Sequence, residues 1–98
     1  MEAFTEAIAQ IYFFSTEDGG RSIPFGQGFS PRLVFDSSPV EYFTELQLEE
    51  SDTLYPGDQI KLQIKIKGEP GIFLHTGASF DLLEAENKIG SGTIMQLI

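Results

Sequence analysis

The chain has 98 residues, which is enough for one globular domain and too few for two. Fifteen acidic residues against six lysines and arginines give a net charge of −9, and a small domain this acidic repels nucleic acid at long range. Cysteine is absent, which excludes disulfides and thiolate metal sites. We see neither a leader peptide nor a long apolar span, so we expect a soluble cytoplasmic protein without membrane contact.

The first strand is expected at about Ala7–Ser15. Ile11-Tyr12-Phe13-Phe14 combines β-branched and aromatic side chains, which fit the pleated surface of a sheet. The apolar residues here lack the spacing of an amphipathic helix. Residues 1–5 are interpreted as a frayed lead-in, and residues 1–98 as a single domain.

A long connection with a specified shape follows between Glu17 and Phe35. It contains four glycines and two prolines between two apolar runs. Glycine admits backbone angles with φ > 0, whereas proline fixes φ near −65°. Loops of this length inside a compact domain are usually functional or disordered. Phe25 and Phe29 favour an ordered, functional loop, because buried aromatic rings hold a loop in place.

The rest of the chain is typical of short strands separated by turns. Every second residue of Gln59–Lys67 is apolar, as in a strand with one buried face. Tyr55-Pro56-Gly57-Asp58 has proline and glycine at the central positions of a type II turn. Further strands are expected at Leu33–Phe35, Val40–Glu49, Ile72–Leu74, Gly77–Leu83 and Ile89–Ile98, with a hairpin turn at Ala85–Lys88. This pattern, with no convincing helix, predicts an all-β barrel or sandwich.

Three motifs resemble parts of one known domain. The first is Gly19-Gly20-Arg21 with Pro24-Phe25 and then Gly28-Phe29-Ser30-Pro31 leading into a strand. Tyr55-Pro56-Gly57-Asp58 looks like a Met-Pro-Gly-Asp turn, and Ile89-Gly90-Ser91-Gly92 looks like a hairpin end that reads Val-Gly-Ala-Gly. In this order and spacing the chain resembles the C-terminal β-barrel domain of elongation factor Tu, the GTPase that carries aminoacyl-tRNA to the ribosome.

The resemblance implies a six-stranded antiparallel Greek-key-like barrel, either as a free-standing protein or as a domain excised from a longer one. The GTPase domain and the adjacent barrel domain of that factor have no counterpart in this sequence. We find no phosphate-binding loop with a Walker-type lysine, and Gly90-Ser91-Gly92 is interpreted as a strand-edge feature. We therefore expect no nucleotide and no cofactor.

The final hairpin departs from the family pattern Phe-x-Ile-Arg-Glu-Gly-Gly-Arg. Leu83 and Asn87 replace its two arginines, and Ala85 and Glu86 replace its two glycines. In the family this hairpin faces tRNA. Because each lost phosphate contact weakens binding, the change disfavours tRNA as a partner here, as does the net charge of −9.

The main hypothesis is a non-enzymatic barrel that binds a protein partner, with mimicry of elongation factor Tu as one form of it. A further form is a decoy or immunity-type protein against a factor that docks on elongation factor Tu. The residues expected to contact the partner are Arg21, Phe25, Gln27, Phe29 and Phe43. Phe43 is included because it interrupts the polar face of Val40–Glu49.

The alternative hypothesis is a translation-associated domain that binds tRNA or another RNA. Its candidate residues are Arg21, Arg32, Lys61, Lys65 and Lys67. The three lysines share one face of one strand, where they are also placed to pair with Glu41, Glu45 or Glu49 on a neighbouring strand. Arg21 has the similar alternative of pairing with Glu17 or Asp18.

We expect neither a metal site nor catalysis. Glu41, Glu45 and Glu49 are four residues apart on a strand, about 13 Å by strand rise, so their carboxylates do not converge on one ion. His75 is the only histidine, and its spacing to Ser79 and Asp81 does not suggest a catalytic triad.

Overall fold

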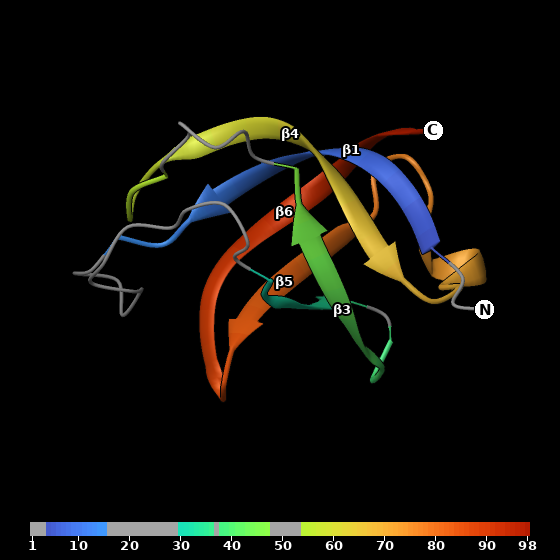
Figure 1. Cartoon of the computed structure of the whole chain (residues 1–98), viewed down its shortest axis with the longest axis horizontal. Helices are drawn as coiled ribbons and strands as arrows, with labels where there is room; N and C mark the ends of the chain where they lie inside the picture. Colours follow the sequence, from blue (N-terminus) through green and yellow to red (C-terminus); the bar gives the residue numbers. More distant parts are fainter. Residues whose placement is uncertain (1–3, 16–29, 37, 48–53) are drawn as a thin grey trace.

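The computed structural model describes residues 4–15, 30–36, 38–47 and 54–98. They form β1 (Phe4–Phe13), β2 (Arg32–Phe35), β3 (Glu41–Leu46), β4 (Gln59–Lys67), a 3₁₀ turn η2 (Gly71–Phe73), β5 (Ser79–Glu84) and β6 (Asn87–Leu97). The strands close into a barrel in the order β1-β4-β3-β2-β5-β6, and each neighbouring pair is antiparallel (Figure 1). Because β1 lies beside β4, and β3 and β2 follow, the connection is a Greek key. The predicted six-stranded barrel is confirmed.

The start of β1 differs from the prediction. The strand begins at Phe4 rather than at Ala7, and Phe4 and Thr5 pair with Lys67 and Ile66 at the end of β4. The Thr5 hydroxyl also donates a hydrogen bond of 3.1 Å to the carbonyl of Gly68. The partner strand is distant in the sequence, so the local pattern of residues 1–5 does not reveal the pairing.

The expected strand at Ile72–Leu74 is wrong, because this stretch lies in and beside η2. Pro70 precedes the turn with helical backbone angles (φ −67°, ψ −16°), and Gly71 adopts φ +63°, a left-handed conformation that favours glycine. The N–H of Leu74 donates to the carbonyl of Gly71 at 3.1 Å. Phe73 and Leu74 pack partly against the core, whereas Ile72 is 87% exposed.

The alternating patterns produce the predicted faces. The apolar side chains of β4 point into the barrel, and its lysines point outward. β3 shows the same alternation over a shorter stretch than expected, and Phe43 points outward as the pattern predicts. Val40 was expected on the buried face, but it lies before β3 and is 46% exposed.

The Tyr55–Asp58 turn agrees with its predicted geometry. Gly57 has φ +95°, as a type II turn requires at its second central position. The N–H of Asp58 donates to the carbonyl of Tyr55 at 3.0 Å, and the Asp58 carboxylate accepts from the N–H of Tyr55 at 2.8 Å. The N–H of Phe13 donates to the carbonyl of Asp58 at 2.9 Å, so the turn is fixed to the end of β1.

An aromatic cluster forms one part of the barrel core. The ring centroids of Phe35 and Phe80 are 6.3 Å apart with an interplanar angle of 76°, and those of Phe35 and Tyr42 are 6.1 Å apart at 69°. These are edge-to-face arrangements, which aromatic rings prefer over face-to-face stacking. The cluster joins β2, β3 and β5, and Phe35 and Phe80 are each 1% exposed.

Two glycines of β6 allow this strand to lie close to its neighbours. A Cβ atom at Gly90 would lie 2.7 Å from the carbonyl oxygen of Tyr12 on β1. At Gly92 it would overlap the Phe80 ring and lie 2.8 Å from the carbonyl oxygen of Gln10. β6 pairs with both β1 and β5 here, so Gly90-Ser91-Gly92 lies inside the sheet, and its interpretation as a strand-edge feature is wrong.

Thr44 places a hydroxyl in the core. It is 0% exposed, and its Oγ1 atom has no hydrogen-bond partner among the residues that the structure describes. A buried polar group without a partner destabilises the folded state. We expect Thr44→Val, which keeps the side-chain shape, to raise the free energy of unfolding by about 1 kcal/mol in urea denaturation.

The matched control for this change is Thr76→Val at an exposed position in the loop before β5, where a shift within about 0.5 kcal/mol is expected. Equal stability of Thr44→Val and the parent chain would contradict the assignment of an unpaired hydroxyl.

No helix among the described segments has the length and apolar character needed to cross a bilayer.

Candidate functional site

The predicted partner site consists of four residues of the connection before β2 and of Phe43 on β3. Arg21, Phe25, Gln27 and Phe29 lie outside the residues that the structure describes. Of the five residues expected to contact a partner, Phe43 is the one with a described environment, and it defines the first candidate surface.

The Phe43 side chain is unusually exposed for an aromatic residue within a sheet. It is 62% exposed on the outer face of β3. Its backbone partner on β2 is Arg32, whose Nη1 atom lies 2.7 Å from Oε1 of Glu41. Glu41 was one of the carboxylates considered as a partner for the lysines, but here it binds Arg32 instead. This ion pair places the Arg32 guanidinium beside Glu41, on the strand that carries Phe43.

The predicted lysine row lies on the outer face of β4, and two of its members, Lys65 and Lys67, have acidic or aromatic neighbours. Lys65 stands in register between Glu6 on β1 and Glu45 on β3, which confirms one of the cross-strand pairings considered for the row. The Nζ atom of Lys65 is 4.2 Å from the centroid of the Phe4 ring, a cation–π distance. Phe4 is 42% exposed, and its register partner is Lys67.

These side chains form one outer surface across β1, β4, β3 and β2. We call it the Phe43 face, and its members are Phe4, Glu6, Arg32, Glu41, Phe43, Glu45, Lys65 and Lys67. It combines two exposed aromatic rings with three cations, and two of those cations face carboxylates. Lys61, the remaining member of the lysine row, lies further along β4 opposite Gln10.

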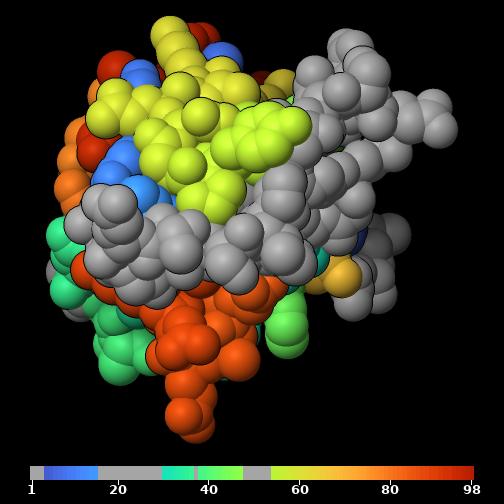
Figure 2. Space-filling model, turned by 90° about the vertical axis from the view of Figure 1, so that its left-hand side faces the viewer, coloured from blue at the N-terminus to red at the C-terminus, as the bar shows by residue number. Residues whose placement is uncertain are grey.

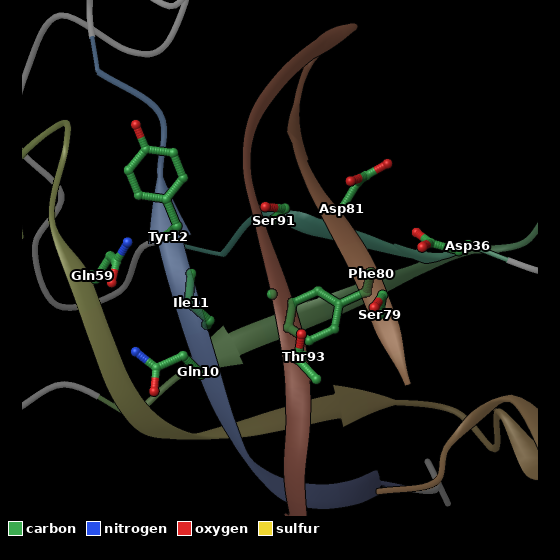
Figure 3. A pocket seen from close by; sticks show the side chains of 11 residues that line it. Gln10, Ile11, Tyr12, Asp36, Gln59, Ser79, Phe80, Asp81, Ser91 and Thr93 are labelled. Atoms are coloured by element: carbon green, nitrogen blue, oxygen red, sulfur yellow. The ribbon is translucent and has the colours of Figure 1, made fainter. Parts of the chain in front are cut away.

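A second candidate site is a polar groove over β1, β6 and β5 (Figure 3). Its volume is about 360 Å³. Two outward rows of side chains cross these strands in register: Tyr12, Ser91 and Asp81 in one, and Gln10, Thr93 and Ser79 in the other. Asp36 and Gln59 complete the polar lining. Ser91 lies between the longer side chains of Tyr12 and Asp81, which lowers the surface along this row.

One end of the groove approaches the β5–β6 hairpin. Figure 2 shows this hairpin, in orange, projecting from the body of the barrel. Ala85 at its tip has φ +54°, the left-handed conformation that favours the glycine found there in the resembled family. Lys88 returns toward the barrel, with Nζ 3.0 Å from Oδ1 of Asp81 and 5.7 Å from the centroid of the Phe14 ring.

The three residues considered and rejected as a catalytic triad occupy different surroundings. Ser79 and Asp81 line the groove, whereas His75 lies in the exposed loop before β5, with Nδ1 3.1 Å from the carbonyl oxygen of Thr76. Within residues 4–15, 30–36, 38–47 and 54–98, no three acidic or histidine side chains gather as a metal site.

Sequence reasoning did not identify the groove. Its lining comes from distant segments, and a polar residue such as Tyr12, Asp36 or Ser91 resembles any solvent-facing strand residue. One sequence feature could have indicated the groove: the small side chains of Gly90-Ser91-Gly92-Thr93 predict a depression where neighbouring strands carry larger side chains.

The strand order and the two surfaces define a small Greek-key β-barrel domain with its candidate sites on the outer surface. The model of one protein family, the elongation factor Tu C-terminal domain, matches residues 1–98, and the chain belongs to this family. The elongation factor Tu C-terminal domain is a non-catalytic, translation-factor domain. The resemblance inferred from the three motifs is thereby confirmed over the whole chain.

Proposed function

We propose that this chain is a non-enzymatic cytoplasmic barrel that binds a protein partner through the Phe43 face. The observation that carries the proposal is the 62% exposure of Phe43 on a strand paired with both β2 and β4. The ring makes little contribution to the core, and it is held on a rigid closed sheet. Aromatic residues and arginine are the residue types that dominate binding energy at protein interfaces.

The surroundings of Phe43 support a role in recognition. The Glu41 carboxylate restrains Arg32, so less side-chain entropy is lost when a partner engages the guanidinium. Lys65 is restrained by its cation–π contact with Phe4, and it stands in register with Glu6 and Glu45. The proposed site extends to Arg21, Phe25, Gln27 and Phe29 of the connection before β2.

Membership in the family suggests how such a partner is recruited. A chain with the shape of the elongation factor Tu C-terminal domain is suited to occupy a site that normally receives that domain. It then acts as a mimic, or as a decoy or immunity-type protein against a factor that docks there. The replacement of the hairpin arginines by Leu83 and Asn87 favours competition for a protein over competition for tRNA.

The test is native co-purification of tagged protein with Phe43→Ala, followed by calorimetry on any partner whose recovery changes. We expect Phe43→Ala to weaken binding about 30-fold, the loss of roughly 2 kcal/mol typical of a central aromatic contact. Tyr55→Ala is the matched control, because Tyr55 is 55% exposed and lies in the turn before β4. Equal recovery of every partner by the parent chain and both variants would exclude Phe43 from the site.

A second candidate function is RNA binding, and one observation favours it. Phe4 and Phe43 are exposed rings beside lysines on one sheet, and single-stranded RNA binds such surfaces by base stacking and phosphate contacts. The carboxylates of Glu6, Glu41 and Glu45 on the same face oppose it. If the chain binds tRNA at about 150 mM salt and loses this binding in Lys65→Ala and Lys67→Ala, the hypothesis of a protein partner is wrong and RNA binding takes its place.

A further inference from the structure

We propose that the polar groove over β1, β6 and β5 binds the guanidinium of an arginine presented by a peptide segment of a partner. This goes beyond the proposed function, because the groove centres on β6 whereas the Phe43 face centres on β4 and β3. The two surfaces can therefore be tested separately.

The shape of the groove follows from β6. Ser91, Gly92 and Thr93 form its floor, and Tyr12 and Asp81 stand in register on either side of Ser91 (Figure 3). Two strand spacings separate Tyr12 from Asp81, which is roughly 10 Å between their backbones. That width admits one extended segment or one long side chain lying along β6, with an aromatic ring on one side and a carboxylate on the other.

The lining favours a cation that donates several hydrogen bonds. None of the described residues that line the groove is a lysine, arginine or histidine. Asp36 and Asp81 supply acceptor-only carboxylates, and the hydroxyl and amide oxygens of Ser79, Ser91, Thr93, Gln10 and Gln59 supply further acceptors. An anion would face the Asp36 carboxylate and find no cation in the lining, because the nearby Lys88 is already bound to Asp81.

The chain itself provides one cation at the end of this groove. Lys88 Nζ is 3.0 Å from Asp81 Oδ1 and lies over the Phe14 ring, whose centroid is 5.6 Å from that of Tyr12. At this end of the groove, a carboxylate (Asp81) and an aromatic ring (Phe14) therefore both contact the same ammonium group. Asp36 forms no ion pair with any residue that the structure describes, so its charge is available to a second cation.

Arginine matches these groups better than lysine does. Its planar guanidinium stacks on an aromatic ring and donates up to five hydrogen bonds in a fixed plane, whereas the lysine ammonium is a point charge. Tyr12 offers the ring, and Asp36 and Asp81 offer the carboxylates. The −9 net charge of the chain also attracts a basic segment at long range.

The experiment titrates the intact chain with acetyl-Gly-Arg-Gly-amide and follows backbone amide shifts by NMR. The matched probe carries citrulline, which keeps the shape of arginine but is uncharged. We expect saturable shifts at Ser79, Ser91 and Gly92 with the arginine peptide and weaker binding by about tenfold with the citrulline peptide. The double variant Asp36→Asn, Asp81→Asn is expected to weaken arginine binding by about tenfold, the equivalent of 1.4 kcal/mol.

Glu69→Gln is the control for charge, because it removes one negative charge at an exposed position outside the groove. Retained binding in Glu69→Gln with loss in the double variant supports the proposal. Equal binding of both peptides, or arginine shifts that persist in the double variant, overturns it. Phe43→Ala is expected to leave this titration unchanged, so failure at the groove is distinguishable from failure at the Phe43 face.

Discussion

Replacing Gly92 with alanine is expected to lower the free energy of unfolding by about 2–3 kcal/mol. The added methyl group would overlap the Phe80 ring and lie 2.8 Å from the carbonyl oxygen of Gln10. The Phe80 side chain is 1% exposed and has little room to turn away. In a domain of this size, 2–3 kcal/mol corresponds to a melting temperature lower by roughly 10–20 °C, which differential scanning calorimetry measures directly.

A double-mutant cycle identifies the cause of this destabilisation. Phe80→Leu replaces the ring that meets the new methyl group by a smaller side chain. It is therefore expected to lower the free energy of unfolding less in the Gly92→Ala background than in the parent chain. The control is Gly90→Ala, where the added Cβ meets the carbonyl oxygen of Tyr12 at 2.7 Å and the nearby Phe13. Phe80→Leu is expected to give Gly90→Ala no rescue. Additive effects in both cycles would show that ring contact is not the cause at Gly92.

Phe35→Ala is expected to destabilise the barrel most, by about 3–5 kcal/mol. The ring is 1% exposed and contacts both Phe80 and Tyr42 edge-to-face, so its removal leaves a cavity and two aromatic rings without their partner. A domain of this size has a total stability of about 5–15 kcal/mol, so the substitution removes at least about a fifth of it. Chemical denaturation followed by far-UV circular dichroism provides the measurement.

Phe35→Leu provides the volume control for this substitution. It retains most of the buried apolar area and loses the ring contacts, and we expect it to cost about 1–1.5 kcal/mol. A loss in Phe35→Ala no larger than that in Phe35→Leu would mean that the surrounding core collapses around the site.

The sequence predicts those elements whose information is local. The alternation in Gln59–Lys67 specifies both the strand and its buried face, and β4 has the predicted bounds. The proline and glycine of Pro56-Gly57 specify a turn through their own backbone preferences. Phe43 was singled out because it breaks a polar alternation, and its outward orientation follows from the same period of two.

Two kinds of feature escaped prediction: those that depend on distant partners, and a short apolar run that fits more than one local structure. Phe4 and Thr5 look like an unpaired terminus until β4 is placed beside them. Three consecutive apolar residues at Ile72–Leu74 fit a strand or a turn equally, and the backbone angles of Pro70 and Gly71 decide for η2. The groove combines side chains from β1, β4, β5 and β6 with Asp36 after β2, so it exists only in the closed barrel.

The closure of the barrel also limits the ways in which a partner is recognised. Each described strand pairs on both sides over at least part of its length, so none of the six strands offers a full-length free edge to which a peptide could add as a further strand. A protein that binds to these strands therefore has to contact side chains on the outer surface. Such side chains can change without disturbing the backbone ladder, which lets the same barrel acquire new binding specificities through a few surface substitutions.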